Sequence, residues 1–200
     1  MSHLKTILTT GGTGFIGSNL FAYFLNENYK VRCLDDLLTL QKSNIERLLD
    51  HPNVEFLELN SLDCDSYSKA SKGLDTTSNK DALGSVSRSI NNPMATKEIN
   101  ALGFLKNMLN AARDNGVKRF VYASSFSVYG DSKISPKKED ELGRPLYSYS
   151  VSKLSNELYG RFFCDLYDIE TIGLRCCNVF GKNQDPNGAY AASIPKFIGL

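Results

Sequence analysis

The segment that most constrains the fold of this chain is a glycine-rich turn, Gly11-Gly12-Thr13-Gly14-Phe15-Ile16-Gly17. A short apolar run, residues 4–9, precedes it, and apolar residues recur at helical spacing over residues 16–25, which predicts a buried strand, a tight turn and a helix. Glycines let the backbone approach a ligand closely, and the free N–H groups at a helix N-terminus attract a diphosphate. The GxxGxxG spacing is one residue longer than the usual dinucleotide fingerprint, but the strand–turn–helix context is the same. The turn therefore predicts a dinucleotide site, with an ordinary glycine-rich turn as the alternative.

A carboxylate follows the next predicted strand. Residues 31–34 read as a strand that ends at Asp35 and Asp36, and Asp35 lies 18 residues after Gly17. A carboxylate in this place accepts hydrogen bonds from ribose hydroxyls and disfavours a 2′-phosphate. NAD is therefore the expected cofactor.

Strand and helix patterns alternate along the rest of the chain. The predicted strands are residues 4–9, 31–34, 54–59, 119–123 and 169–174, and the predicted helices are residues 16–25, 43–49, 99–112 and 147–167. A polar loop, residues 132–145, precedes the last helix. This alternation predicts βαβ units and an α/β fold of the Rossmann type, with a doubly wound parallel sheet over residues 1–182.

Tyr149 and Lys153 lie four residues apart at the start of a predicted helix, which places them on one helical face. An ammonium near a phenol favours the phenolate, so we expect Lys153 to lower the pKa of Tyr149 from about 10 toward the working pH. The spacing alone is common on surface helices. Together with a dinucleotide site, it indicates reversible hydride and proton transfer at a carbinol.

The composition excludes several other classes of function. A net charge of +1 gives no reason to expect nucleic acid or an anionic membrane surface as a partner. No apolar run approaches the roughly 18 residues of a membrane span. The 5 cysteines show no CxxC spacing and the chain has only 2 histidines, so no metal site is expected. Reduced thiols and the lack of room for a signal peptide before the first strand predict a cytoplasmic protein.

Several longer segments carry a resemblance to a known family. They are TGGTGFIG (10–17), ALGSVSRSI (82–90), GVKRFVYASS (116–125), VYGD (128–131), YSVSK (149–153), NVFG (178–181) and QDPNGAYAA (184–192). In these segments the chain resembles the extended short-chain dehydrogenase/reductase family, and within it the UDP-hexose and UDP-N-acetylhexosamine 4-epimerases. The last two segments are similar to the N-acetylhexosamine type.

The resemblance implies roles for individual residues. Tyr149 would be the base that takes the proton of the sugar 4-hydroxyl, Lys153 would hold the nicotinamide ribose, and Ser125 would hydrogen-bond the same hydroxyl. The implied cofactor contacts are Gly11, Gly14, Phe15, Ile16, Gly17, Asp35, Asp36, Ser61, Leu62, Asn100 and Lys153. The implied substrate contacts are Arg88, Ser127, Tyr149 and Asn178. The implied reaction oxidises the 4-hydroxyl with tightly held NAD, rotates the 4-keto sugar and returns the hydride to its other face.

The resemblance also implies partners. The substrate would be a UDP-sugar, and the long helices over residues 99–112 and 147–167 would form a four-helix bundle with a second chain, in a homodimer or a heterodimer. Family members continue well past residue 200. Residues 183–200 are therefore expected to begin a substrate-binding region, and the chain is expected to be C-terminally shortened.

The chain also departs from the family pattern. Residues 74–81, LDTTSNKD, are polar where the family has an apolar strand beside the first strand. Central strands of parallel sheets are buried on both faces, so burying these side chains without partners is expected to cost several kcal/mol and to give the weakest strand and a poorer cofactor pocket. Ser61 replaces an aspartate that reaches the adenine. Cys176 and Cys177 replace aromatic residues and are expected to line the site rather than to act as redox centres.

Three alternatives to an active epimerase remain open. The chain could be a degenerate or shortened homologue with weak activity or none, and it could act as a non-catalytic dimer partner of a full-length relative. It could also be a nucleotide-sugar dehydratase or reductase. Dehydratases place Asp-Glu directly after the hydroxyl residue, for general acid and base work in removing water, whereas Phe126 and Ser127 follow Ser125 here.

Overall fold

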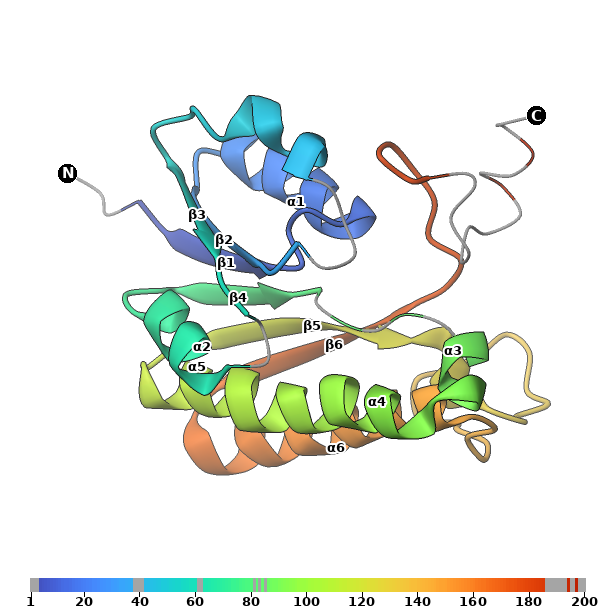
Figure 1. Ribbon diagram of the computed structural model, residues 1–200. Coiled ribbons are helices and arrows are strands. Elements are labelled where there is room, and N and C mark those ends of the chain that lie inside the picture. The colour runs from blue at the N-terminus through green and yellow to red at the C-terminus, as the bar shows by residue number, and fades with distance from the viewer. Residues whose placement is uncertain are drawn as a thin grey trace.

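Six parallel strands form one twisted sheet through the centre of the molecule (Figure 1). The computed structural model describes residues 4–37, 42–60, 63–80, 82, 84, 86–185, 194 and 197. The strands are β1 (Thr6–Thr10), β2 (Lys30–Asp35), β3 (Val54–Glu58), β4 (Thr76–Asn79), β5 (Arg119–Ser125) and β6 (Glu170–Cys176). Their order, β3-β2-β1-β4-β5-β6, changes direction between β1 and β4, as in the predicted doubly wound Rossmann sheet.

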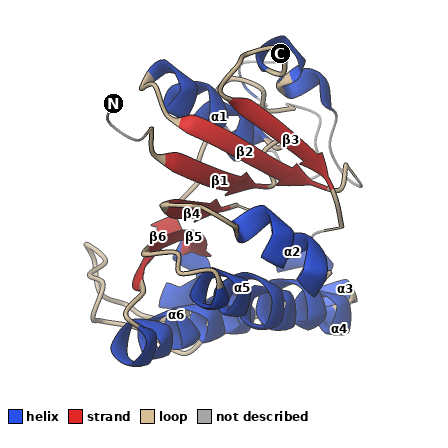
Figure 2. Cartoon of the chain, turned by 90° about the vertical axis from the view of Figure 1, so that its left-hand side faces the viewer, coloured by secondary structure: helices blue, strands red, loops and turns tan. Residues whose placement is uncertain are grey.

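Helices cover both faces of this sheet (Figures 1 and 2). On one face α1 (Phe15–Asn26) packs against β1 and β2, beside the short 3₁₀ turns η1 (Lys42–Asn44) and η2 (Glu46–Leu48). The other face carries α2 (Cys64–Ser71), α3 (Val86–Asn91), α4 (Pro93–Lys97), the π-wound η3 (Glu98–Leu109), α5 (Asn110–Asp114) and α6 (Ser148–Tyr167). A further 3₁₀ turn, η4 (Phe126–Tyr129), follows β5. Residues 93–114 thus form one long helical run that lies along α6.

Each face has its own apolar core. The larger core joins the sheet to the helical run, and Phe104 of η3 lies at its centre. The Phe104 ring packs edge-on against the rings of Phe120 and Tyr122 of β5, with distances between ring centres of 5.7 and 5.0 Å. The smaller core lies under α1, where Phe21 packs with Val31 and other buried residues of that face. Burial of these rings holds α6 and β5, which carry the chemistry described below, in fixed relative positions.

The predicted strands are confirmed to within two residues at each end, and the predicted helices at 16–25, 99–112 and 147–167 are confirmed as parts of α1, of the run 93–114 and of α6. The helix predicted over residues 43–49 is wrong. Ile45, with φ −121° and ψ 0°, interrupts the segment, so it forms two 3₁₀ turns instead. The helix α2 was not predicted, because it contains few apolar residues. Asp63 caps it by accepting a hydrogen bond from the Ser66 N–H at 3.0 Å.

The polar segment after Leu74 forms a strand despite its composition. β4 has only four residues, and it lies between β1 and β5 with Thr77 opposite Leu8 and Phe120. The side chain of Asn79 is satisfied because its Oδ1 accepts a hydrogen bond from the Thr10 hydroxyl. The Thr77 hydroxyl and the Lys80 Nζ are buried with no hydrogen-bond partner among the described residues. This strand is therefore held by its backbone ladder and its neighbours rather than by its own side chains.

The expected beginning of a substrate-binding region, residues 183–200, lies mostly outside the described residues, since only residues 183–185, 194 and 197 of it are described. Within the described ranges, no helix combines the length and the apolar character that crossing a membrane requires.

Candidate active site at the carboxyl edge of the sheet

The glycine turn connects β1 to α1 at the carboxyl edge of the sheet, and its tight geometry depends on glycine. Gly11 has φ +61°, and its N–H donates to the Leu34 carbonyl at 3.1 Å. A Cβ on Gly17 would lie 2.1 Å from the Gly11 carbonyl oxygen and 2.8 Å from the Gly12 Cα. The first turn of α1 therefore lies directly against the loop, and its amides are directed at the space above the sheet edge, where an anion can bind.

Asp35 at the end of β2 fastens the glycine turn. Its Oδ2 accepts hydrogen bonds from the Thr13 N–H at 2.9 Å and the Thr13 hydroxyl at 2.7 Å, and its Oδ1 accepts from the Leu37 N–H at 3.0 Å. The buried carboxylate thus has a structural role that the sequence did not reveal. A carboxylate has about four lone-pair sites, so Asp35 can still accept from ribose hydroxyls.

Tyr149 and Ser125 meet at the same edge. Ser125 ends β5, Tyr149 is in the first turn of α6, and the phenol is hydrogen-bonded to the Ser125 side chain. Lys153, one turn further along α6, is buried and its Nζ donates to the Ala123 carbonyl oxygen at 2.9 Å. The Nζ lies 5.8 Å from the centre of the Tyr149 ring. The structure therefore brings the three predicted catalytic residues together.

The pKa of Tyr149 differs from the prediction. Burial raises the pKa of the phenol, the hydrogen bond with Ser125 lowers it, and nearby Cys176 raises it further, so the net direction is upward. The prediction that Lys153 lowers this pKa is wrong for this structure. The physical reason is that desolvation of the phenolate outweighs a lysine whose ammonium is directed to a backbone carbonyl.

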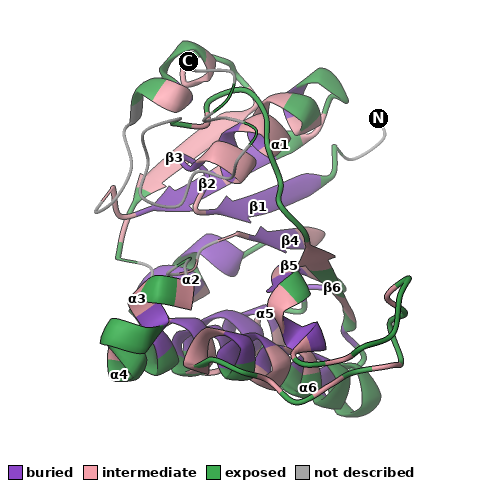
Figure 3. Ribbon diagram, turned by 90° about the vertical axis from the view of Figure 1, so that its right-hand side faces the viewer, coloured by how far each residue is buried: buried purple, intermediate pink, exposed green. Residues whose placement is uncertain are grey.

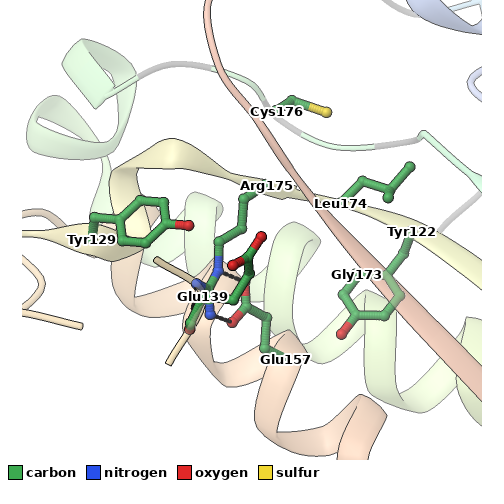
Figure 4. A pocket seen from close by; sticks show the side chains of 8 residues that line it. All are labelled: Tyr122, Tyr129, Glu139, Glu157, Gly173, Leu174, Arg175 and Cys176. Carbon is green, nitrogen blue, oxygen red and sulfur yellow. Dashed lines mark hydrogen bonds and ion pairs between the residues drawn. The ribbon is translucent and has the colours of Figure 1, made fainter. Parts of the chain in front are cut away.

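A partly buried ion pair anchors α6 to the end of β6 (Figure 4). Arg175 donates from Nε to Glu157 Oε1 at 3.0 Å and from Nη2 to Oε2 at 2.8 Å, and the Ser124 hydroxyl also donates to Glu157. The Tyr129 ring lies 4.9 Å from the guanidinium carbon. Since Glu157 is one helical turn after Lys153, the pair fixes the position of the helix that carries Lys153 and Tyr149.

This ion pair was not predicted from the sequence. The available signal was the four-residue spacing from Lys153 to Glu157, which continues the Tyr149–Lys153 spacing along α6. An open pocket of about 520 Å³ lies beside the pair, and Cys176 at its rim points away from Arg175 (Figure 4). The lining residues are Tyr122, Tyr129, Glu139, Glu157, Gly173, Leu174, Arg175 and Cys176.

The structure places the other predicted substrate residues around this edge. Arg88 is in α3, which is held to the start of α6 by a hydrogen bond from the Ser148 hydroxyl to the Ser89 carbonyl at 2.9 Å. Ser127 is in η4, and its hydroxyl is buried without a hydrogen-bond partner among the described residues. Asn178 is exposed, two residues beyond β6, with φ +43°. Ser127 thus has a buried polar group next to Ser125 that no described residue satisfies.

The remaining predicted cofactor residues lie on both sides of the turn. Phe15 and Ile16 begin α1, and a Cβ added at Gly181 would lie 3.4 Å from the Phe15 ring. Asn100 is buried in η3, where its carbonyl oxygen accepts from the Asn156 side chain at 2.8 Å. Asp36 follows β2 and is partly exposed. Ser61 and Leu62 lie outside the described residues, so their predicted adenine contacts stay predictions.

The segment after β6 returns to α1, which the sequence did not predict. Asn19 donates from Nδ2 to the Lys182 carbonyl at 2.7 Å, and Asn183 donates from Nδ2 to the Ser18 hydroxyl at 3.0 Å. These bonds bring residues 181–183 next to the helix that begins at the glycine turn (Figure 1). The carboxyl edge is therefore bordered by the turn, by the start of α6 and by this returning segment.

Comparison with known proteins gives a family match over nearly the whole chain. A family model described as the NAD dependent epimerase/dehydratase family matches residues 7–199. A curated relative named putative UDP-glucose 4-epimerase, from Methanocaldococcus jannaschii, is 37% identical over 184 residues, which are 91% of this chain and 58% of that protein.

Solved structures show the same similarity. The UDP-N-acetylglucosamine 4-epimerase of Methanobrevibacter ruminantium superposes with a TM-score of 0.91 at 35% identity, covering 98% of this chain and 62% of that one. The UDP-glucose 4-epimerase of Thermus thermophilus in complex with NAD superposes with a TM-score of 0.82 at 32% identity, covering 92% of this chain and 58% of that one. A dTDP-glucose 4,6-dehydratase of Streptomyces venezuelae superposes with a TM-score of 0.87 at 29% identity, covering 97% of this chain and 61% of that one. The chain thus spans about 60% of the length of these relatives.

Proposed function

This chain belongs to the NAD-dependent epimerase/dehydratase family, and from this premise we propose that it catalyses the 4-epimerisation of a UDP-hexose or a UDP-N-acetylhexosamine through a transient 4-keto sugar. The observation that carries the proposal is the Tyr149 phenol, hydrogen-bonded to Ser125 and one turn from Lys153, at the sheet edge that holds the glycine turn. This arrangement suits the removal of a proton from a hydroxyl as hydride leaves the adjacent carbon.

The residues after Ser125 favour epimerisation over dehydration. Elimination of water requires a further acid and base near the sugar. Phe126 and Ser127 occupy the next two positions, and neither side chain titrates in the working range. The dTDP-glucose dehydratase that superposes well shares the fold, so the distinction rests on these side chains rather than on the fold.

The residues present fit NAD. Gly17 leaves no room for a Cβ between the turn and α1, so the backbone is compact where a diphosphate would approach. Asp35 at the end of β2 would hold the adenosine ribose, and Lys153 would hold the nicotinamide ribose. When bound, NAD supplies the hydride acceptor for sugar C4 and the donor for its return. In the proton step, Tyr149 accepts the proton of the 4-hydroxyl while Ser125 orients that hydroxyl.

The direct test is an activity assay on the chain with added NAD. We expect UDP-N-acetylglucosamine to be converted to UDP-N-acetylgalactosamine, or UDP-glucose to UDP-galactose, as followed by proton NMR of the anomeric signals. A 4-keto-6-deoxy product would show dehydration and would replace the proposal. NAD binding without any turnover would favour the degenerate homologue, and no NAD binding would contradict the proposed cofactor site.

We also propose that the chain pairs with a second chain, its own copy or a full-length relative, through α6 and the run 93–114. Apolar side chains on α6 are exposed at spacings of seven, four and four residues, at Val151, Leu158, Phe162 and Leu166, with exposed fractions of 54, 64, 47 and 61%. Such a stripe lies along one side of a helix, and Figure 3 shows exposed surface along α6. An apolar stripe of this kind supports a helix-bundle interface.

The pairing gives a specific prediction for Leu158, the most exposed member of this stripe. Leu158→Glu is expected to shift a dimer to a monomer, because it places a charge at the centre of the apolar contact. Leu4→Glu is the matched control, since Leu4 is 49% exposed at the start of the chain and outside the stripe. Light scattering after size-exclusion chromatography measures the mass. A wild-type chain that stays monomeric with and without a full-length relative would contradict the proposal.

A further inference from the structure

Lys80, whose amine is buried, lies at the centre of the sheet edge. It directly follows β4, and its N–H donates to the Thr10 carbonyl at 3.3 Å, so it is adjacent to the end of β1 and the start of the glycine turn. Its Nζ is shielded from solvent and has no hydrogen-bond partner among the described residues. A lysine in this condition is rare, because burial of an unpaired ammonium is costly.

Strand alternation shows where this side chain points. Asn79 pairs with Tyr122 in the β4–β5 register, so Lys80 comes level with Ala123 and lies on the opposite face from Tyr122. Ser125 and Cys176 are paired in the β5–β6 register and lie on that same face as Ala123. Lys80 therefore points toward the space bordered by the glycine turn and Ser125, away from the helical core that contains Tyr122.

The titratable groups at this edge do not include a free counter-ion for Lys80. Cys176 at the end of β6 is the one group that raises the lysine pKa, and desolvation, which lowers it, is the larger effect. Tyr149 is hydrogen-bonded to Ser125, and Lys153 is itself a cation. Asp35 accepts hydrogen bonds from Thr13 and Leu37, and it is not among the groups that shift the lysine pKa. Within the described part of the chain, the amine therefore lacks the anion that would stabilise its charged form.

An apolar side chain at this position would avoid the cost of burying an unpaired amine, which indicates that the lysine has a function. The backbone of Lys80 lies beside Thr10, where the glycine turn begins, and the amides at the start of α1 favour an anion in front of that turn. The lysine ammonium and these amides would border the same space and bind one anion between them. Paired charges and helix amides together bind phosphate groups strongly.

We propose that Lys80 binds the diphosphate of the dinucleotide, and that its amine takes up a proton from solvent when the diphosphate arrives. The inference rests on the proposed NAD site and adds to it a charged side chain and a proton linkage. The proton balance is simple: burial increases the fraction of the amine that is neutral in the free chain, that fraction takes up one proton from solvent in the complex, and no other bond forms or breaks.

Calorimetric titration in two buffers with different ionisation enthalpies tests the proton uptake. NAD and ADP-ribose share the diphosphate, whereas adenosine lacks it. Between about pH 8 and pH 10 we expect uptake of up to about one proton on binding NAD or ADP-ribose, and none on binding adenosine. Diphosphate binding without proton uptake would overturn the inference and leave the proposed function standing, whereas absence of NAD binding would overturn both.

The variant Lys80→Met provides an independent test. This variant is expected to bind ADP-ribose about 10- to 100-fold more weakly and without proton uptake, because a charge-assisted contact is lost. Lys5→Met is the matched control, since Lys5 is exposed at the opposite end of β1 and should leave binding unchanged. Unchanged affinity in Lys80→Met would contradict the inference, and the wild-type proton measurement stands even if the variant does not fold.

The same variant should gain stability when no ligand is present. Burial lowers the pKa of Lys80 in the folded chain below its ordinary 10.5, so between the two values the unfolded chain binds more protons and wild-type stability rises with pH. Lys80→Met has no such group, so its unfolding temperature is expected to exceed that of the wild type near neutral pH and the difference to shrink toward about pH 10.5. A less stable Lys80→Met would show that the amine has a partner in the free chain and would overturn the inference.

Discussion

Tyr149→Phe is expected to lower the rate of epimerisation by about 10²- to 10⁴-fold while leaving NAD affinity unchanged. In the proposed reaction the phenol accepts the sugar proton, and phenylalanine keeps the ring and its packing but cannot accept a proton. Turnover of UDP-sugars followed by NMR, together with calorimetric titration of NAD, measures the two effects separately. A loss of both activity and NAD binding would indicate a structural role for the phenol instead.

The control for this variant lies further along the same helix. Tyr159→Phe removes a phenolic hydroxyl from the same helix at a position where the side chain is 40% exposed, almost three helical turns beyond Tyr149. It should therefore leave the rate unchanged. If Tyr149→Phe retained most of the wild-type rate, the assigned base would be wrong and the proton would have to leave through another group at this edge.

Gly17→Ala is expected to abolish NAD binding and to destabilise the fold by about 1–3 kcal/mol. The new methyl group would lie 2.1 Å from the Gly11 carbonyl oxygen and 2.8 Å from the Gly12 Cα. Both of these atoms belong to the backbone, so the clash can be relieved only by moving the turn away from α1. Opening the turn would separate the amides that are aimed at the diphosphate.

Urea unfolding and NAD titration of this variant measure the two consequences. Gly84→Ala is the control for stability, because a Cβ at Gly84 meets nothing within 4 Å. A Gly17→Ala chain with wild-type stability and NAD affinity would show that the turn adapts and that its compactness is not needed for the cofactor.

The fold could be predicted because its signals are local. The glycine turn, the apolar runs and the helical periodicity each lie within a short stretch of sequence, and the alternation rule then orders them into a parallel sheet. Two elements were mispredicted for the same reason. The local pattern of residues 43–49 resembles a helix, but Ile45 is fully buried and separates two 3₁₀ turns, and α2 has too few apolar residues to be recognised as a helix.

The site could be predicted only in part, because its energetics depend on contacts between distant segments. Tyr149, Lys153 and Ser125 are recognisable by type and spacing. The rise in the pKa of Tyr149 is caused mainly by burial of the phenol, and the spacing of residues in the sequence does not show how deeply a side chain is buried. The Glu157–Arg175 pair and the approach of Lys80 to Cys176 each join residues on different elements, and the structural role of Asp35 depends on the conformation of the turn.

β4 has a consequence for the order in which the chain folds. It is the seam between a β1–β2–β3 half and a β5–β6 half, yet its four residues bring little apolar surface of their own. Its ladder partners are about 70 residues earlier along the chain on one side and about 43 residues later on the other. Such distant pairings form slowly, because the entropy of loop closure is lost before any contact compensates for it. The two halves of the sheet should therefore be structured before the seam closes, and the edge that binds the dinucleotide is completed last.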